Sequence, residues 1–364
     1  MHIEQMLNCA CFAIFTYAKF IYQHQLRRKE SDYAISSINM YKVNILTSEN
    51  ALFSTVFGPY DMLLQAGVFW NLINKKQPTP LFEVDISSID GKEICGMAGA
   101  KIIPHKKADR KDQYDIILIP SEGMNIDPAN ESFSKRVEYI NEMHSKGAVI
   151  ASICTGAFLI ASTGLLNDKT ATTHWAFEQI FKSYYPKVKI RTDLLIADND
   201  QIITAGGVTA DQDLCMHIIS RFCGHEIAIQ TARCTLIDRT SREQKPYRTF
   251  AVEKNHGDDQ ILKCQNYIDK NLIKDVSIEE LSRIISTSDR TFIRRFKAAT
   301  GHSLVNYIQQ LKIEKSKYIL ERDNVSFDEI SHDLGYENVS FFRRLFKKNV
   351  GITPKEYKRM FYKG

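Results

Sequence analysis

One cysteine of this 364-residue chain stands where an α/β protein would expose a nucleophile. Cys154 follows the apolar run 148–153 and precedes Thr155 and Gly156, an order that predicts a strand, a sharp turn and a helix. At the first turn of a helix, the helix dipole favours the thiolate over the thiol. The chemistry that this arrangement permits is attack by sulfur or binding of a small molecule at the turn.

A cysteine nucleophile needs a base and an oriented partner. His174 is the candidate base, but a histidine beside Trp175 more often has a structural role. Ligands of open α/β sheets bind at the carboxyl ends of the strands, where Cys154 is expected. We therefore favour a ligand pocket over a buried structural thiol or a catalytic cysteine, and its predicted lining is Cys154, Thr155, Gly156, His174 and Trp175.

A second set of informative residues belongs to an internal repeat in the last third of the chain. The segment 276–281 recurs 49 residues later at 325–330, and after one inserted residue the offset becomes 50. At that offset Phe292 and Phe296 match Phe342 and Phe346. The repeated unit is too short for a solenoid and indicates a duplicated helical module.

Each unit is predicted to hold two short helices joined by a tight turn, as in a helix-turn-helix. Ser277 is the expected N-cap of the first helix, and a second helix runs to about Thr300. Phenylalanines four residues apart bury together, which leaves a basic stripe on another face. Arginine donates two hydrogen bonds to guanine in the major groove. The residues predicted to contact DNA are Arg290, Ile293, Arg294 and Lys297 in the first unit, and Ser340, Arg343, Arg344 and Lys347 in the second.

The elements that carry these residues fall into two predicted domains. Apolar runs at 43–46, 81–86, 114–119 and 148–153 predict buried strands, and 61–74 and 133–145 have helical spacing. This alternation predicts an α/β domain over 41–238, with a mostly parallel sheet and flavodoxin-like layering. A polar stretch, 239–259, is the predicted linker, and 260–364 is predicted to be all-α with two helix-turn-helix units, a helix at 304–321 standing between them.

Charge and cysteine content narrow the class of protein. Residues 252–364 hold 21 Lys and Arg against 16 Asp and Glu, whereas the rest of the chain holds 27 of each, so the net charge of +5 lies in the helical part. A basic module favours nucleic acid as partner. The eight cysteines form no CxxC pair, which argues against a disulfide framework or a zinc site and favours a reducing cytoplasm. No metal or cofactor is expected.

The first forty residues are predicted to be an extension of the α/β domain. The apolar stretch 6–22 is interrupted by Asn8, Thr16 and Lys19, so it lacks the roughly 18 apolar residues of a membrane span. Its basic residues follow the apolar part, whereas those of a secretory signal precede it. Two interpretations are favoured, a loosely ordered helix or a translated extension upstream of Met40, and a membrane anchor is the less favoured third.

The helical part resembles the paired helix-turn-helix domain of AraC/XylS-type transcription regulators. The stretches SDRTFIRRFKAATG at 288–301 and LGYENVSFFRRLFKKNVGITPKEY at 334–357 carry the resemblance, which covers about 260–362. Leu304 departs from the pattern that Pro354 follows in the second unit. The resemblance implies binding to a double-stranded DNA operator, with RNA polymerase as a further partner.

The α/β part resembles the class I glutamine-amidotransferase-like, PfpI-type domain over about 42–238. The stretches SICTGAFLIASTGLLNDKTATTHW at 152–175 and TAGGVTA at 204–210 carry this resemblance. Catalytic relatives have a histidine where this chain has Thr155, and a carboxylate near a Gly-Pro pair where it has Thr55. Where they have a Gly-Gly turn, it has Ser121-Glu122-Gly123. These departures argue against an enzyme.

Together, the two resemblances imply a cytoplasmic transcription regulator of the branch in which a PfpI-type domain precedes an AraC-type domain. The first domain is expected to sense a small-molecule effector without catalysis and to form a homodimer. The alternative is a cysteine-dependent amidase or glyoxalase-like enzyme with a DNA-tethering tail.

Overall fold

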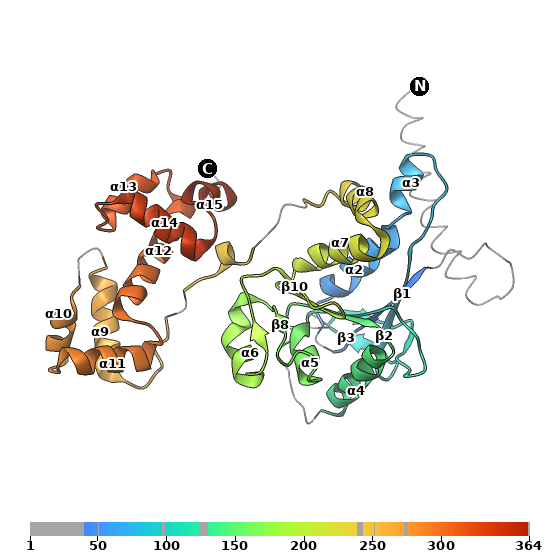
Figure 1. Ribbon diagram of the computed structural model, residues 1–364, viewed down its shortest axis with the longest axis horizontal. Coiled ribbons are helices and arrows are strands. Elements are labelled where there is room, and N and C mark those ends of the chain that lie inside the picture. Colours follow the sequence, from blue (N-terminus) through green and yellow to red (C-terminus); the bar gives the residue numbers. More distant parts are fainter. Residues whose placement is uncertain are drawn as a thin grey trace, which may run out of the picture. The chain divides into compact units, whose positions relative to one another are not determined.

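The computed structural model describes residues 40–49, 51–96, 99–123, 130–238, 243–250, 252–272 and 276–362. The expected N-terminal extension lies outside the described residues, except for Met40. The chain divides into two compact units, Met1–Gln244 and Lys245–Gly364 (Figure 1). Each unit is described by itself.

The first unit is built on a seven-stranded sheet of order β10-β11-β7-β6-β1-β2-β5. Neighbouring strands are parallel except for the edge pair β10–β11. In chain order the five central strands run 2-1-3-4-5, which is the flavodoxin-like order, so the predicted fold class is confirmed. The strands are β1 (Tyr41–Leu46), β2 (Phe82–Ser88), β5 (Lys106–Lys107), β6 (Ile116–Ile119), β7 (Val149–Ile153), β10 (Ile196–Asp198) and β11 (Ile202–Ala205).

Helices cover both faces of the sheet because its central strands are apolar on both sides. In β6, Ile116 and Leu118 enter one core, whereas Ile117 and Ile119 enter the other. The first core is closed by α2 (Ser54–Gln65), α7 (Ala210–Cys223) and α8 (His225–Thr235). The second is closed by α4 (Glu131–Ser145), α5 (Gly156–Ser162) and α6 (Glu178–Tyr184).

The four predicted strands are confirmed, but the helix expected at 61–74 is two helices. Helix α2 begins at Ser54 and contains Pro59, and the short α3 (Phe69–Ile73) follows a break at Gly67. Gly67 has φ +75°, and a Cβ there would lie 2.2 Å from the Thr79 carbonyl oxygen, so only glycine fits. Gly58-Pro59, a pair that is typical of turns, is here helical, because burial of the α2 face outweighs that local signal.

The second unit contains seven α-helices in its described residues. They form two small cores that share α12: one packs α9 to α11 on its first half, and the other packs α13 to α15 on its second half. The helices are α9 (Asp259–Lys270), α10 (Ile278–Ile284), α11 (Asp289–Thr300), α12 (Leu304–Arg322), α13 (Phe327–Asp333), α14 (Val339–Val350) and α15 (Pro354–Phe361).

The division between the units falls within the predicted linker 239–259. Gln244 is 4% exposed and is buried in the first unit. Tyr247 and Phe250 instead belong to the second unit, where their rings contact Phe361 and Tyr307 at centroid distances of 5.6 Å. Among the described helices, none is long and apolar enough to cross a membrane.

Candidate nucleic-acid interface and sensor site

Capping side chains fix the ends of the first helix-turn-helix, α10–α11. The Ser277 hydroxyl accepts a hydrogen bond from the Glu280 N–H, and that of Ser288 accepts one from the Thr291 N–H. Gly301 ends α11 in the left-handed conformation. These capping signals lie within the unit itself, and the predicted pair of helices with its turn is confirmed.

Helix α11 has one buried and one exposed face. Phe292 and Phe296 are fully buried, with ring centroids 5.5 Å apart. The four residues predicted to contact DNA are all exposed, and their spacing places them on one side of the helix: Arg290, Ile293, Arg294 and Lys297.

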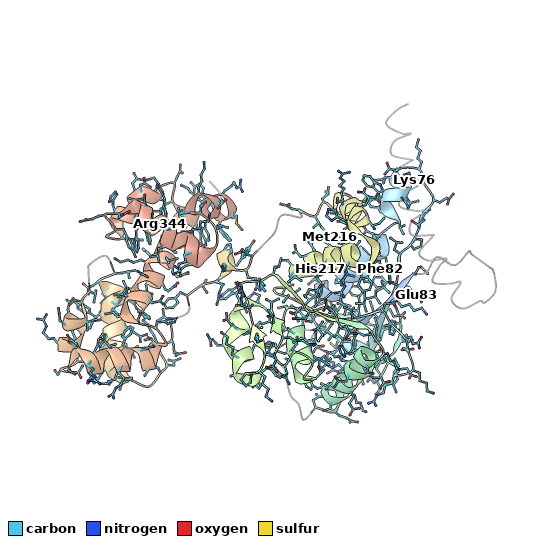
Figure 2. The ribbon with its side chains drawn as sticks, in the orientation of Figure 1. Lys76, Phe82, Glu83, Met216, His217 and Arg344 are labelled. Atoms are coloured by element: carbon cyan, nitrogen blue, oxygen red, sulfur yellow. The ribbon has the colours of Figure 1, made fainter. Side chains whose placement is uncertain are left out.

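The second helix-turn-helix, α13–α14, repeats this geometry at the 50-residue offset. Ser326 and Glu329 form a capping box at α13, and Asn338 caps α14. Phe342 and Phe346 are fully buried. The predicted residues are again all exposed, and Arg344 is labelled on this helix in Figure 2: Ser340, Arg343, Arg344 and Lys347.

The charged groups on the two stripes differ in their partners. Arg343 forms an ion pair with Asp328 of α13, which the sequence did not suggest. Within the described residues, Arg290, Arg294 and Arg344 make no ion pair, so their guanidinium donors are available to an incoming ligand. Arg295 is different, because it donates two hydrogen bonds to Asp258 and anchors α11 to the cap of α9.

In the first unit, Cys154 occupies the predicted sharp turn between β7 and α5. Its φ of +54° is the left-handed conformation, which is uncommon for a residue other than glycine. Its N–H donates to the Ala205 carbonyl (2.7 Å), and its own carbonyl accepts from the Thr173 hydroxyl (2.8 Å). The side chain is 3% exposed. The backbone of this turn is therefore fixed by two neighbouring segments.

The surroundings of the Cys154 sulfur favour the neutral thiol. Burial raises the thiol pKa and outweighs the lowering effects of the Ser121 hydroxyl and of nearby backbone groups of Thr155, Gly207 and His174. The expectation that the helix dipole favours the thiolate is thus wrong, because desolvation is the larger effect.

No base is positioned for the sulfur among the described side chains that surround Cys154. The His174 ring caps a short 3₁₀ turn at 175–177 by accepting from the Ala176 N–H (3.2 Å), and burial lowers its pKa. The buried Thr55 hydroxyl accepts from the Ser121 N–H and donates to the Leu52 carbonyl. Both residues thus have structural partners where a catalytic site needs a base and a carboxylate.

The other predicted pocket residues surround the same turn. Thr155 is buried and its hydroxyl donates to the Glu122 carbonyl. A Cβ on Gly156 would lie 2.6 Å from the Pro120 carbonyl oxygen, so this glycine serves close packing. The Trp175 N–H donates to the side chain of Gln244 (3.0 Å), and Gln244 in turn donates to Thr172, Thr173 and Leu194. The sequence did not suggest Gln244, because it lies in the predicted linker.

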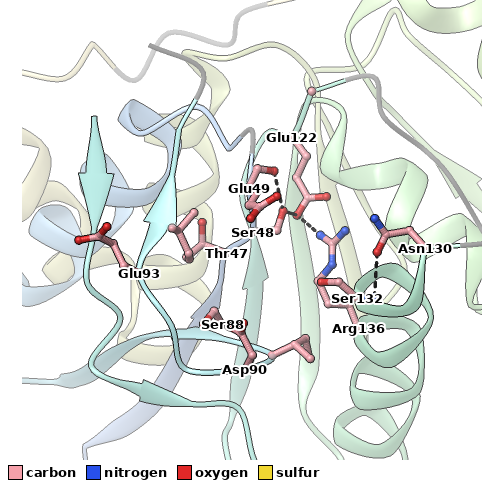
Figure 3. Close-up of a pocket in the computed structure, with 13 residues that line it drawn as sticks. Thr47, Ser48, Glu49, Ser88, Asp90, Glu93, Glu122, Asn130, Ser132 and Arg136 are labelled. Atoms are coloured by element: carbon pink, nitrogen blue, oxygen red, sulfur yellow. Dashed lines mark hydrogen bonds and ion pairs between the residues drawn. The ribbon is translucent and has the colours of Figure 1, made fainter. Parts of the chain in front are cut away.

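A polar pocket of about 200 Å³ lies beside this turn, at the carboxyl ends of β1, β2 and β6 (Figure 3). None of the five predicted ligand-binding residues lines it. Its lining includes the ion pair between the half-buried Glu122 and the buried Arg136, and the Ser48 hydroxyl donates to the same Glu122 oxygen (2.8 Å). In the sequence, Ser121-Glu122-Gly123 is only a departure that argues against an enzyme, and no pocket is predicted there.

Comparison with known proteins assigns both units. Residues 281–360 match a helix-turn-helix domain model, and residues 42–221 match the DJ-1/PfpI family. The HTH-type transcriptional regulator GbdR of Pseudomonas aeruginosa is 22% identical over 287 residues, covering 78% of this chain and 77% of its own. An uncharacterized HTH-type transcriptional regulator in the cgkA 5′ region of Pseudoalteromonas carrageenovora is 32% identical over 126 residues. The match covers 35% of this chain and 74% of that protein.

Among solved structures, an AraC family transcriptional regulator from Pseudomonas putida aligns with 54% of this chain and 99% of its own, at 15% identity and a TM-score of 0.45. The duplicated helix-turn-helix, the flavodoxin-like sheet and the sequence matches agree with one another. The chain belongs to the AraC-type helix-turn-helix transcriptional regulators and carries an N-terminal DJ-1/PfpI-family domain.

Proposed function

We propose that this DNA-binding transcriptional regulator contacts two successive major-groove segments with α11 and α14. The observation that carries the proposal is the shared register of the two exposed stripes. Arg294 and Arg344 occupy equivalent positions, and so do Lys297 and Lys347. An exposed arginine in this setting can donate two hydrogen bonds to guanine O6 and N7, whereas lysine suits the phosphates.

The first prediction concerns the two equivalent arginines. Each of Arg294→Ala and Arg344→Ala should cost about 1–3 kcal/mol on the cognate operator, because a bidentate guanine contact is lost. Fluorescence anisotropy on an operator selected from genomic fragments measures this in the full chain. Arg110→Ala, a surface change in the other unit, is the control. Unchanged cognate affinity in the Arg294/Arg344 double variant would contradict the proposal.

We propose further that the DJ-1/PfpI unit is a sensor without catalytic activity. Support comes from the neutral, buried thiol of Cys154 and from the structural partners of His174 and Thr55. The five predicted pocket residues around Cys154 remain candidates for effector contact: Cys154, Thr155, Gly156, His174 and Trp175.

The second prediction is that Cys154 reacts slowly with alkylating agents. Since its raised pKa keeps the thiol protonated near neutral pH, reaction should become appreciable only as the pH rises toward that pKa. Peptide-resolved mass spectrometry after iodoacetamide treatment compares Cys154 with the exposed Cys95. Fast labelling of Cys154, together with turnover of amides or 2-oxoaldehydes that Cys154→Ser abolishes, would instead support the enzyme alternative.

The third prediction is a cytoplasmic homodimer formed through the α/β unit. Two linked copies gain affinity because the second DNA-binding event is intramolecular, and the basic unit must stay open for DNA. RNA polymerase is the further partner that the family suggests. Sedimentation of the full chain should give a dimer. A monomer at micromolar concentration, both free and on DNA, would refute this assembly.

A further inference from the structure

Gln244 is the last residue of the first unit, and its side-chain amide fills a polar niche of that unit. The Oε1 atom accepts a hydrogen bond from the Trp175 N–H (3.0 Å). The Nε2 group donates to the Thr172 hydroxyl (3.1 Å) and to the carbonyls of Thr173 (3.0 Å) and Leu194 (2.9 Å). A primary carboxamide offers one carbonyl oxygen and two N–H donors, so both ends of this group are satisfied.

The niche has room for the carboxamide because Gly206 lacks a side chain. A Cβ on Gly206 would lie 1.9 Å from Gln244 Nε2, so any side chain at this position would displace the amide. Gln244 is 4% exposed, whereas most glutamine side chains remain in water. The first unit therefore binds Gln244 as a specific ligand, although this residue lies in the predicted linker.

The niche shares its residues with the turn that carries Cys154. The Thr173 hydroxyl donates to the Cys154 carbonyl (2.8 Å), while the Thr173 carbonyl accepts from Gln244. His174 and Trp175, which are predicted to contact an effector, follow directly in the chain. A shift of this segment would disturb the Cys154 turn and the bonds to Gln244 together, because Thr173 takes part in both.

The residues that follow Gln244 are held by the second unit. The 3₁₀ turn η2 (Lys245–Tyr247) lies against α14, and its tyrosine ring contacts Phe361. Lys317 of α12 donates to the Arg248 carbonyl (2.5 Å). Because Gln244 and η2 are adjacent in the sequence, the anchor in one unit is followed directly by the anchor in the other.

We propose that Gln244 is a latch through which the sensor unit and the DNA-binding unit influence each other. With the amide in its niche, the chain leaves the first unit at a fixed point. With the amide released, Gln244 no longer constrains η2, which lies against the DNA-contacting helix α14. An effector that displaces the segment 172–175 would shift the equilibrium toward release. The inference rests on the proposed sensor function.

Coupling between two sites is reciprocal, so operator DNA must affect the latch if the latch affects operator binding. This reciprocity allows a test without an identified effector. The reporter is the Trp175 amide, because its hydrogen-bond acceptor is Gln244 Oε1.

Hydrogen–deuterium exchange on the full chain, resolved at the Trp175 amide, shows whether the latch is seated. Gln244→Ala should raise the exchange rate of this amide about tenfold, because the acceptor is lost. Gln244→Glu has nearly the same size and should also release the latch, because a second oxygen would face the carbonyls that accept from Nε2. Gln230→Ala, which removes a glutamine bonded to Glu226 of the same helix, is the control and should change nothing.

The operator selected from genomic fragments then tests the coupling. Saturating the wild-type chain with operator should change the Trp175 exchange rate about fivefold or more, and Gln244→Ala should abolish that change. Trp175 exchange that is the same in wild type and Gln244→Ala, or that does not respond to operator, would overturn the proposal. A wild-type chain that binds no operator would contradict the proposed function, and the Gln244 variants would still decide whether the latch is seated.

Discussion

At the residue scale, α11 and α14 differ at two of the four exposed positions that are predicted to contact DNA. Arg290 and Ile293 of α11 are replaced by Ser340 and Arg343 of α14. Ile293 is 47% exposed between basic neighbours, although exposing an apolar side chain to water is unfavourable. In the major groove, an apolar side chain contacts the thymine methyl group. The two major-groove segments contacted by α11 and α14 should therefore differ in base sequence.

The fourth prediction follows from Ile293. Replacing the contacted thymine by uracil removes one methyl group, worth about 0.8 kcal/mol, and should weaken wild-type binding about fourfold. The Ile293→Ala variant should bind both DNAs equally. Anisotropy with thymine-to-uracil scans of the operator makes the comparison. A wild-type protein indifferent to uracil at every position of both half-sites would exclude this contact.

At the element scale, a helix or strand could be predicted from the sequence where the residues that determine it lie close together in the chain. The helix-turn-helix units were predictable because N-caps, helix-ending glycines with positive φ and phenylalanines four apart lie within each unit. The start of α2 at Ser54 could not be predicted, because the Gly58-Pro59 pair inside this helix is typical of a turn. A Cβ on Gly58 would lie 2.6 Å from Asp211 of α7, a contact that only the tertiary structure reveals.

The candidate pocket of the α/β unit was only partly predictable for the same reason. The turn at Cys154 has a contiguous sequence signal, and the structure confirms its geometry. The lining of the pocket comes from loops after three strands and from the first two turns of α4, which no periodicity connects. Gln244 likewise bonds to residues 50 to 72 positions away, so no local pattern marks it as part of the first unit.

At the scale of the whole molecule, the chain combines an α/β unit of net charge −2 (25 Lys and Arg against 27 Asp and Glu in 1–244) with a helical unit of net charge +7 (23 against 16 in 245–364) that carries two equivalent stripes. The stripes are joined through α12, a helix of 19 residues and thus about 28 Å long. That length is close to the roughly 34 Å repeat of the duplex. A single helical unit therefore suits two major-groove segments on one face of the DNA.

The fifth prediction tests this central claim directly, by methylation interference at guanine N7 on the selected operator. The wild-type chain should show two clusters of interfering guanines about one duplex turn apart for each half-site. Arg294→Ala should abolish interference in one cluster, and Arg344→Ala should abolish it in the other. A single cluster, or the same pattern in both variants, would contradict the account.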